Sequence, residues 1–431
     1  MSGPEILSLV LLVAVFALAI WRDVNVGLVA MPAAFLLGGI AGIPKEQILA
    51  GFPAGIVALI VGVMYMFGHA QRSGAFDRVV HGIVRVSGGR DWVLPWSLFA
   101  VGAVLSGIGT LPSATVAIVL PVAMRVARNR NIDPVLMAIV AAHGAGAGGF
   151  SPMSPWAAIV KDLAAKSGVH YSENLLFLGL AGFDVLSTAV FFFALGGLPL
   201  IRRGRTEGDA AGSTAGTGAG GRPAEAVQGA SRITPYEIGS LAGLGVFVLA
   251  VLVLDLNIVF AAFAVGLVLH LVFRPDGRRV IADIPWGVVM LTVGILVYVG
   301  DLEAAGTLKT IAGHLGGIGA PVVAALAIAY VAALFATVES STVAVLGVVV
   351  PLTAAVLPHQ TSAQFTALLI AVCGTIGGVA ISPLHLGGGL VLANVDDGDH
   401  KRVFRWLLGW SVGAAVVLPA LLMVLPVSFG L

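Results

Sequence analysis

Long apolar stretches recur from one end of the sequence to the other, and they constrain this chain more than any other feature. Eight are unbroken and have roughly the 17–25 residues with which a helix crosses a hydrocarbon core about 30 Å thick. They cover about 5–21, 25–42, 53–70, 175–199, 236–253, 258–273, 285–300 and 405–428. Only 10% of the side chains are charged, against about 25% in soluble domains. We therefore predict an all-α polytopic membrane protein.

Four further apolar regions are interrupted by residues that break helices. These regions are 92–125, 133–165, 318–357 and 362–395. Gly107, Gly109 and Pro112 interrupt the first, a polar cluster interrupts the third, and Gly-rich turns with Ser-Pro pairs interrupt the others. Irregular backbone at membrane depth is tolerated where it is buried in protein or lines a cavity. We expect the first and third regions to be re-entrant helical hairpins and the other two to be broken helices that cross once.

The distribution of basic residues supports this arrangement, because cytoplasmic loops are enriched in Lys and Arg. With about ten crossings and two hairpins, 19 of the 23 basic residues fall on one face, and only Lys45, Lys161, Lys166 and Lys309 fall outside or near that face. Counting either hairpin as a full crossing would scramble this asymmetry. The predicted location is the cell membrane, with both termini outside. Residues 1–5 contain no basic residue, so we expect the first stretch to be a retained span.

A segment without apolar periodicity divides the chain. Residues 206–231 are rich in Gly, Ala, Ser and Thr, which is typical of a flexible linker. The expected organisation is a first membrane repeat at 1–203, a cytoplasmic linker at 204–233 and a second membrane repeat at 234–431.

The two halves resemble each other. Pro53, Gly55, Gly62, Gly68 and Gly74 recur 232 residues later as Pro285, Gly287, Gly294, Gly300 and Gly306. The Ser113–Ala117 segment recurs at offset 227, and the Ser-Pro pair at 151 recurs at offset 231. Because each half has five crossings, the second half has the opposite orientation. Such inverted-topology repeats with broken helices are typical of secondary transporters, whose site lies near the bilayer midplane.

Hydroxyl side chains open a helix at each predicted hairpin tip. A helix N-terminus has unpaired N–H groups and a partial positive charge, so it can bind a carboxylate without Lys or Arg. A lone Ser or Thr in a membrane helix more commonly bonds its own backbone, but the occurrence in both halves favours binding. The predicted substrate-binding residues are Ser113, Thr115, Ser151, Pro152, Ser340, Ser341, Thr342, Ser382 and Pro383.

Glycine turns and an intramembrane acid offer a second kind of site. Glycines let backbone carbonyls turn toward a cation, and an acid at membrane depth can bind a proton or cation. The predicted coupling-ion residues are Gly109, Gly148, Gly149, Thr337, Glu339 and Gly378. Close helix packing is the alternative for the glycine run at 144–149, and a position at the outer opening is the alternative for Glu339. His143 and His385 are read more readily as buried structural histidines than as ligands.

Two segments of the sequence resemble a known protein family. The segment 51–77 and Gly149-Phe150-Ser151-Pro152 resemble the N-terminal part of MatC-type dicarboxylate (malonate) carriers. More distantly, the chain apart from the linker is similar to the divalent anion/sodium symporters of the ion transporter superfamily. This resemblance implies homodimers, an elevator movement and a Ser-Asn-Thr motif at each tip that binds carboxylates and sodium. Ser113 and Thr115, and then Ser340 and Thr342, match the outer residues of that motif, while its Asn is replaced.

The expected function is secondary-active transport of a small organic anion, with a dicarboxylate as the expected substrate and Na⁺ or H⁺ as the coupling ion. A carrier or exporter of gluconate, citrate or an inorganic oxyanion is the alternative, and an anion channel is less favoured. No cofactor or metal centre is expected, since the sequence has one Cys and no zinc-protease or Walker motif. A net charge of +1 disfavours nucleic-acid binding. We predict that the protein is not an enzyme.

Overall fold

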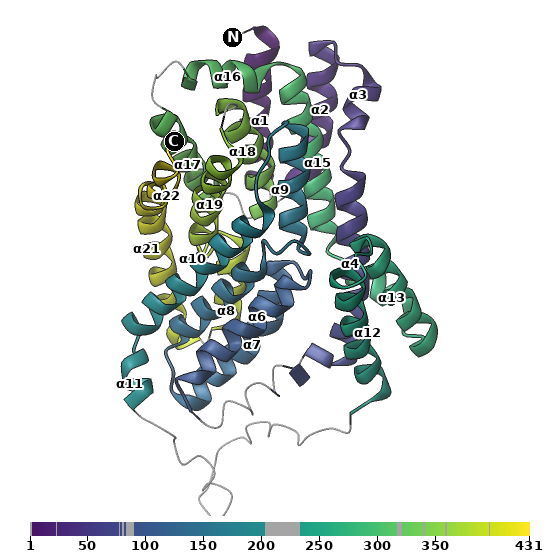
Figure 1. Ribbon diagram of the computed structural model, residues 1–431, viewed down its shortest axis with the longest axis vertical. Helices are drawn as coiled ribbons and strands as arrows, with labels where there is room; N and C mark the ends of the chain where they lie inside the picture. The colour runs from purple at the N-terminus through teal and green to yellow at the C-terminus, as the bar shows by residue number, and fades with distance from the viewer. Residues whose placement is uncertain are drawn as a thin grey trace, which may run out of the picture.

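The computed structural model describes ten ranges of the chain (Figure 1): 2–22, 24–76, 78–79, 82, 90–202, 233–316, 321–338, 341–357, 360–395 and 397–431. Apart from residue 233, the predicted linker lies outside them. Six helices in these ranges are long and apolar enough to span a membrane, and seven shorter apolar helices accompany them. The predicted all-α polytopic fold is confirmed.

The helices fall into two successive series. The first contains α1 (Gly3–Arg22), α2 (Val26–Ala41), α3 (Lys45–Ala50), α4 (Ala54–Ser73), α6 (Val93–Gly107), α7 (Pro112–Arg130), α8 (Pro134–Gly148), α9 (Pro155–Lys166), α10 (Glu173–Ala194) and α11 (Gly197–Arg202). The second contains α12 (Pro235–Leu252), α13 (Ile258–Phe273), α14 (Gly277–Ala282), α15 (Trp286–Ala304), α16 (Thr307–Gly316), α17 (Pro321–Val338), α18 (Thr342–Val356), α19 (Ser362–Val379), α20 (Leu386–Asn394), α21 (Asp397–Leu422) and α22 (Val424–Ser428).

The second series reproduces the first. Both ends of α13 lie 232 residues after those of α2, and the same holds for α14 and α3. Asn25 and Asn257 cap α2 and α13 identically, since each side chain accepts from the backbone N–H two residues later at 2.9 Å. Gly74 and Gly306 both turn the chain with φ of 81°, where glycine is favoured. The repeat that the Pro and Gly spacing predicts is therefore a structural repeat.

The predicted hairpins and broken helices are present. Helices α6 and α7 form the first hairpin, and α17 and α18 form the second. Helix α8 is separated from α9 by an irregular segment at 149–154, and α19 from α20 by one at 380–385. Helices α7 and α18 begin 230 residues apart and contain Pro121 and Pro351 at the same offset. The hydroxyl motifs, which match in sequence at an offset of 227, therefore differ in their position on the helices: Thr342 is the first residue of α18, whereas Thr115 lies one turn inside α7.

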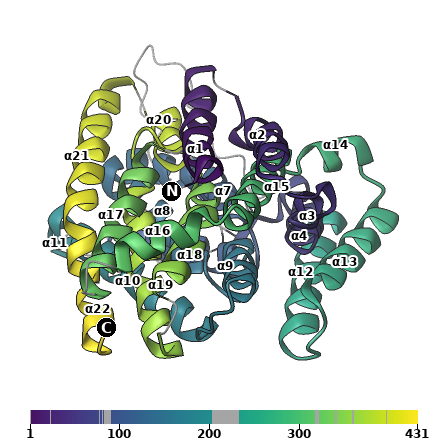
Figure 2. The same cartoon turned by 90° about the horizontal axis from the view of Figure 1, so that it is seen from above.

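The two series interlock. Helix α2 packs on α15, and α4 packs on α13; we call these four helices the frame. The hairpins and broken helices, with α10 and α21, form a central body in which α9 contacts α18, α7 contacts α20 and α10 contacts α19. Seen from above, α2, α4 and α15 lie beside the central body, and α13 lies farther out (Figure 2). Both termini lie at one end of the molecule and α11 at the other (Figure 1), as an even number of crossings requires.

Candidate functional site

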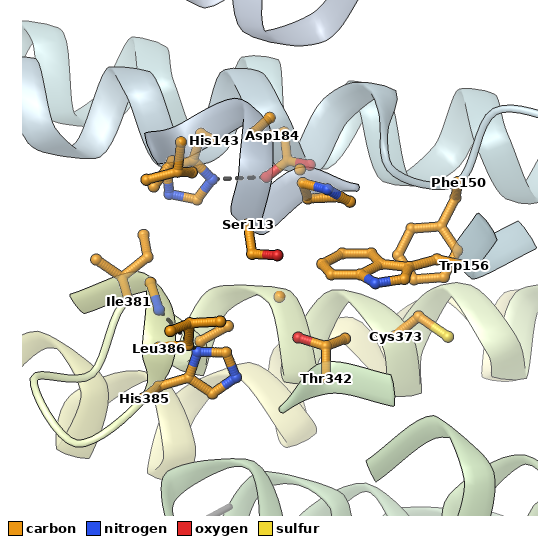
Figure 3. Close-up of a pocket in the computed structure, with 18 of the residues that line it drawn as sticks. Ser113, His143, Phe150, Trp156, Asp184, Thr342, Cys373, Ile381, His385 and Leu386 are labelled. Atoms are coloured by element: carbon orange, nitrogen blue, oxygen red, sulfur yellow. Dashed lines mark hydrogen bonds and ion pairs between the residues drawn. The ribbon is translucent and has the colours of Figure 1, made fainter. Parts of the chain in front are cut away.

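A cavity of about 100 Å³ lies where both hairpins and both broken helices meet (Figure 3). Its lining includes the first or second residue of each of four helices, namely Pro112 of α7, Trp156 of α9, Thr342 of α18 and Leu386 of α20, and residues near the ends of α8 and α19. Four helix N-termini therefore direct their partial positive charge toward one space, which favours an anion. Within the described part of the chain, no Lys or Arg lines this cavity. Helix ends and neutral donors therefore supply its attraction for anions.

The two hairpins contribute hydroxyl groups from the beginnings of their second helices. Ser113, the second residue of α7, and Thr342, the first residue of α18, both point into the cavity (Figure 3). Thr342 is buried, and its Oγ1 has no hydrogen-bond partner among the described residues. The N-cap residues of α7 and α18, Leu111 and Ser341, make no side-chain hydrogen bond that caps the helix. These two helix starts thus keep donors for a ligand.

The two breaks end in caps of different chemistry. Ser154 caps α9: its Oγ accepts from the Trp156 N–H and donates to the Gly149 carbonyl at 2.5 Å. At the matching position His385 caps α20, its Nδ1 accepting from the Gly387 N–H at 3.2 Å. Because Nδ1 accepts, the neutral ring carries its hydrogen on Nε2. That atom is buried and has no partner among the described residues, so His385 combines a structural cap with an unused donor at the cavity wall.

A buried histidine–aspartate pair lies on the opposite wall. His143 of α8 and Asp184 of α10 are buried, and their Nδ1 and Oδ1 atoms are 2.6 Å apart. The imidazole ring stacks on Phe191 at a centroid distance of 5.9 Å. A Cβ at Gly146 would lie 3.0 Å from Asp184 Oδ2, so glycine leaves room for the carboxylate there. The sequence interpretation missed Asp184, although an acid inside the apolar stretch 175–199 was a usable signal.

The remaining walls are mostly apolar. Phe150 and Trp156 form an aromatic wall, with ring centroids 5.4 Å apart (Figure 3). Leu180, Ile381 and Leu386 add aliphatic surface. Such a surface limits the number of polar contacts and leaves the helix ends to orient a ligand.

The predicted substrate-binding residues are only partly brought together. Ser113, Ser341 and Thr342 line the cavity. Thr115 is fully buried between α6 and α7, where its Oγ1 accepts from Ser106 Oγ at 3.0 Å. Ser340 lies outside the described residues.

The predicted Ser-Pro residues shape the breaks. Ser151 Oγ donates to the Gly107 carbonyl at 2.6 Å, which ties the first broken helix to the first hairpin. Ser382 Oγ accepts from the Leu384 N–H at 3.3 Å. Such local bonds organise a turn in place of helix. Pro152 is exposed and Pro383 half-buried, and neither is among the described residues that line the cavity.

The predicted coupling-ion residues lie in helix contacts and turns. A Cβ at Gly148 would lie 2.2 Å from the Ala103 carbonyl oxygen, and one at Gly378 would lie 2.2 Å from Leu418 Cδ1. Thr337 Oγ1 donates to the Ala333 carbonyl of its own helix at 2.7 Å. These contacts match the packing alternative.

Gly109 and Gly149, two further predicted coupling-ion residues, lie near the first break. A Cβ at Gly149 would lie 2.9 Å from Pro112 Cγ, and Gly109 turns the hairpin with φ of 117°. Glu339 lies outside the described residues. Among the described glycines, those that line the cavity are Gly146, Gly374, Gly377 and Gly387.

Part of the sequence matches a known protein family. Residues 1–149 match the sequence model of the N-terminus of the dicarboxylate carrier protein MatC. The MatC match extends from α1 through α8 to the first break, and it confirms the predicted resemblance in that region. No curated protein matches the chain.

A solved structure extends the likeness to the whole chain. The Alcanivorax borkumensis YdaH transporter is similar, with 16% sequence identity and a TM-score of 0.54, over 96% of this chain and 98% of that one. At this identity the likeness shows the fold: the protein has the architecture of a solved transporter. It is a multi-pass membrane protein.

Proposed function

We propose that the protein is a secondary-active transporter of a small organic anion, with a dicarboxylate as substrate. One observation carries the proposal: four helix N-termini, Ser113, Thr342 and His385 converge on one cavity inside a transporter fold. Neutral donors and helix dipoles can hold two carboxylates without a permanent cation. The MatC match over residues 1–149 supports a dicarboxylate over other anions.

Alternating access in this proposal is an elevator movement of the central body against the frame, in a homodimer. The cavity is lined mostly by the central body, but Val288 of α15 closes it from the frame. Such a boundary position supports sliding of one body past the other. Transport is coupled to Na⁺ or H⁺, with both termini outside the cell and the linker in the cytoplasm. The protein acts as a carrier and not as an enzyme.

The test is transport by purified protein in liposomes loaded with unlabelled malonate or succinate. We expect saturable counterflow of the labelled dicarboxylate. Replacing both Ser113 and Thr342 by Ala should lower uptake at low substrate concentration by about 100-fold, since each hydrogen bond to a charged group contributes about 1.5–3 kcal/mol. Ser411→Ala is a matched control, because that buried hydroxyl bonds the Leu408 carbonyl of its own helix. Undiminished uptake by the folded double variant would remove the site assignment.

The same liposomes separate the alternative functions. A panel of gluconate, citrate and sulfate as competitors identifies another anion if one of them inhibits counterflow better than malonate or succinate. A channel would show anion flux without saturation and without counterflow. Either result would replace the proposed dicarboxylate carrier.

A further inference from the structure

We propose that the His143–Asp184 pair is the proton site that couples anion transport to the pH gradient. This inference rests on the proposed carrier function and specifies its coupling ion. Both residues lie in membrane-embedded helices and line the cavity (Figure 3), with Nδ1 and Oδ1 2.6 Å apart. Ionisable side chains inside a membrane are costly and are commonly part of ion or proton pathways.

The charge of the pair explains how a proton and an anion would bind together. With Nδ1–H donating to the carboxylate, a neutral His143 has its lone pair on Nε2, and the pair has a net charge of −1. Nε2 is buried and has no partner among the described residues. A proton from water on one side of the membrane bonds to that lone pair, which gives an imidazolium–carboxylate pair of net charge zero. The proton returns to water on the other side.

Because the charged pair lines the cavity, proton binding and anion binding affect each other. An anion in the cavity is repelled by the unprotonated pair, and protonation removes that repulsion. By linkage, the bound anion raises the proton affinity of the pair by the same factor. The central body therefore binds proton and anion as a unit and returns empty without either.

Aromatic rings and the cavity lie next to the pair. His143 faces the rings of Phe183 and Phe191, and α6 carries no titratable side chain. Cys373 and His385 share the cavity wall. The other described titratable groups on or beside the elements packed against α8 and α10 are not among the residues that line the cavity: Arg125, Arg128 and Arg130 of α7, Asp133, Glu173, Arg202, and Asp399, His400, Lys401, Arg402 and Arg405 of α21.

The pair belongs to one repeat alone. At the offset of 231 that relates the two breaks, His143 corresponds to Gly374, which lines the same cavity. The inverted repeat thus duplicates the helix ends but not this ion pair. A single pair fits one proton per transport cycle.

The experiment compares driving forces in proteoliposomes. Labelled malonate or succinate uptake is measured with an outside-acid pH gradient, with an inward Na⁺ gradient at equal pH, and by counterflow without ion gradients. The variants are Asp184→Asn and His143→Gln. Asp301→Asn is the matched control, because Asp301 is a buried acid of α15 that is not among the described residues lining the cavity.

For the wild type and Asp301→Asn, we expect accumulation driven by the pH gradient. Asp184→Asn removes the charge that repels the anion, so it should retain counterflow but lose pH-driven accumulation by about 10-fold or more. His143→Gln leaves the Asp184 carboxylate without its proton acceptor, so it should lose the same accumulation and also raise KM, with a KM that no longer depends on pH. Accumulation by Asp184→Asn like that of the wild type would overturn the assignment, and so would wild-type uptake driven by Na⁺ and insensitive to pH. Absence of counterflow in the wild type would instead remove the proposed carrier function.

A measurement on the wild type keeps the proposal testable if the variants do not fold. Malonate binding by the detergent-solubilised protein is followed by calorimetry in buffers of different ionisation enthalpy. Uptake of about one proton per bound anion is expected from the linkage. Binding without proton uptake at every pH between 5 and 8 would overturn the proposal.

Discussion

The two broken helices share one backbone design. In the first, Ser151 Oγ accepts from the Met153 N–H at 3.2 Å, and in the second, Ser382 Oγ accepts from the Leu384 N–H at 3.3 Å. In both, the last residue of the break caps the following helix. The duplicated part of the site is therefore the set of helix ends, which depends on backbone geometry.

The side chains that surround this shared backbone differ between the repeats. The first repeat places the His143–Asp184 pair at the cavity, and the second places Thr342 and the His385 cap there. Thr342 Oγ1 and His385 Nε2 are donors without partners among the described residues. The helix ends at the cavity are thus common to both repeats, whereas the proposed proton pair belongs to the first repeat alone. Three pairs of variants test this comparison, each with one residue from either repeat.

The largest effect on stability is expected in the frame, at Gly294 of α15 and its repeat partner Gly62 of α4. A Cβ at Gly294 would lie 2.0 Å from the Gly27 carbonyl oxygen, a backbone atom, whereas one at Gly62 would meet the ring of Phe263 at 2.8 Å. Gly294→Ala must separate α2 from α15, and we expect it to lower the free energy of unfolding by about 3 kcal/mol. Gly62→Ala should cost about 1 kcal/mol, because a ring can shift.

Thermal unfolding in detergent measures both changes. Gly39→Ala in α2 is the control, since nothing lies within 4 Å of a Cβ there, and its midpoint should not fall. Equal losses for Gly294→Ala and Gly62→Ala would show that the two faces of the frame tolerate side chains alike.

The second pair tests the two hairpin tips through Thr342 and Thr115. Thr342→Val removes an unpartnered hydroxyl at the cavity, and we expect KM to rise about 10-fold with an unchanged unfolding midpoint. Thr115→Val leaves Ser106 Oγ without its acceptor, so it should lower the free energy of unfolding by about 1–3 kcal/mol and change KM little. Initial uptake rates and thermal unfolding give both quantities. A reversed result, with KM raised only by Thr115→Val, would move the substrate to the first tip.

The hairpins and breaks could be predicted because their signals are local. Gly and Pro interrupt a helix wherever they occur, so their spacing gave the breaks and the repeat offset of 232 before any contact was known. The register at the tips could not be predicted in this way. Pro112 opens α7 and Ser341 precedes α18, and this difference shifts otherwise similar hydroxyl motifs by three residues.

The sequence pattern could not predict the role of a residue where that role depends on contact with another helix. A glycine that turns a carbonyl to an ion and one that admits a neighbouring helix give the same sequence signal. The close approach of Ala103 to Gly148 and of Leu418 to Gly378 therefore could not be predicted. Asp184 carried a signal of its own, but its partner is on a different helix.

The smallest effects are expected where the two breaks differ by one cap, Ser154 or His385. His385→Ser gives the second break the cap of the first, so the free energy of unfolding should change by no more than about 0.5 kcal/mol. Ser154→Ala removes a cap, so it should lower the free energy of unfolding by about 1 kcal/mol. If Nε2–H of His385 donates to the substrate, His385→Ser raises KM about threefold to tenfold, and Ser154→Ala leaves KM unchanged. Uptake rates and thermal unfolding measure the two quantities separately. An unchanged KM in His385→Ser would mean that both caps are purely structural, and the substrate contacts of the second repeat would then come from α18 alone.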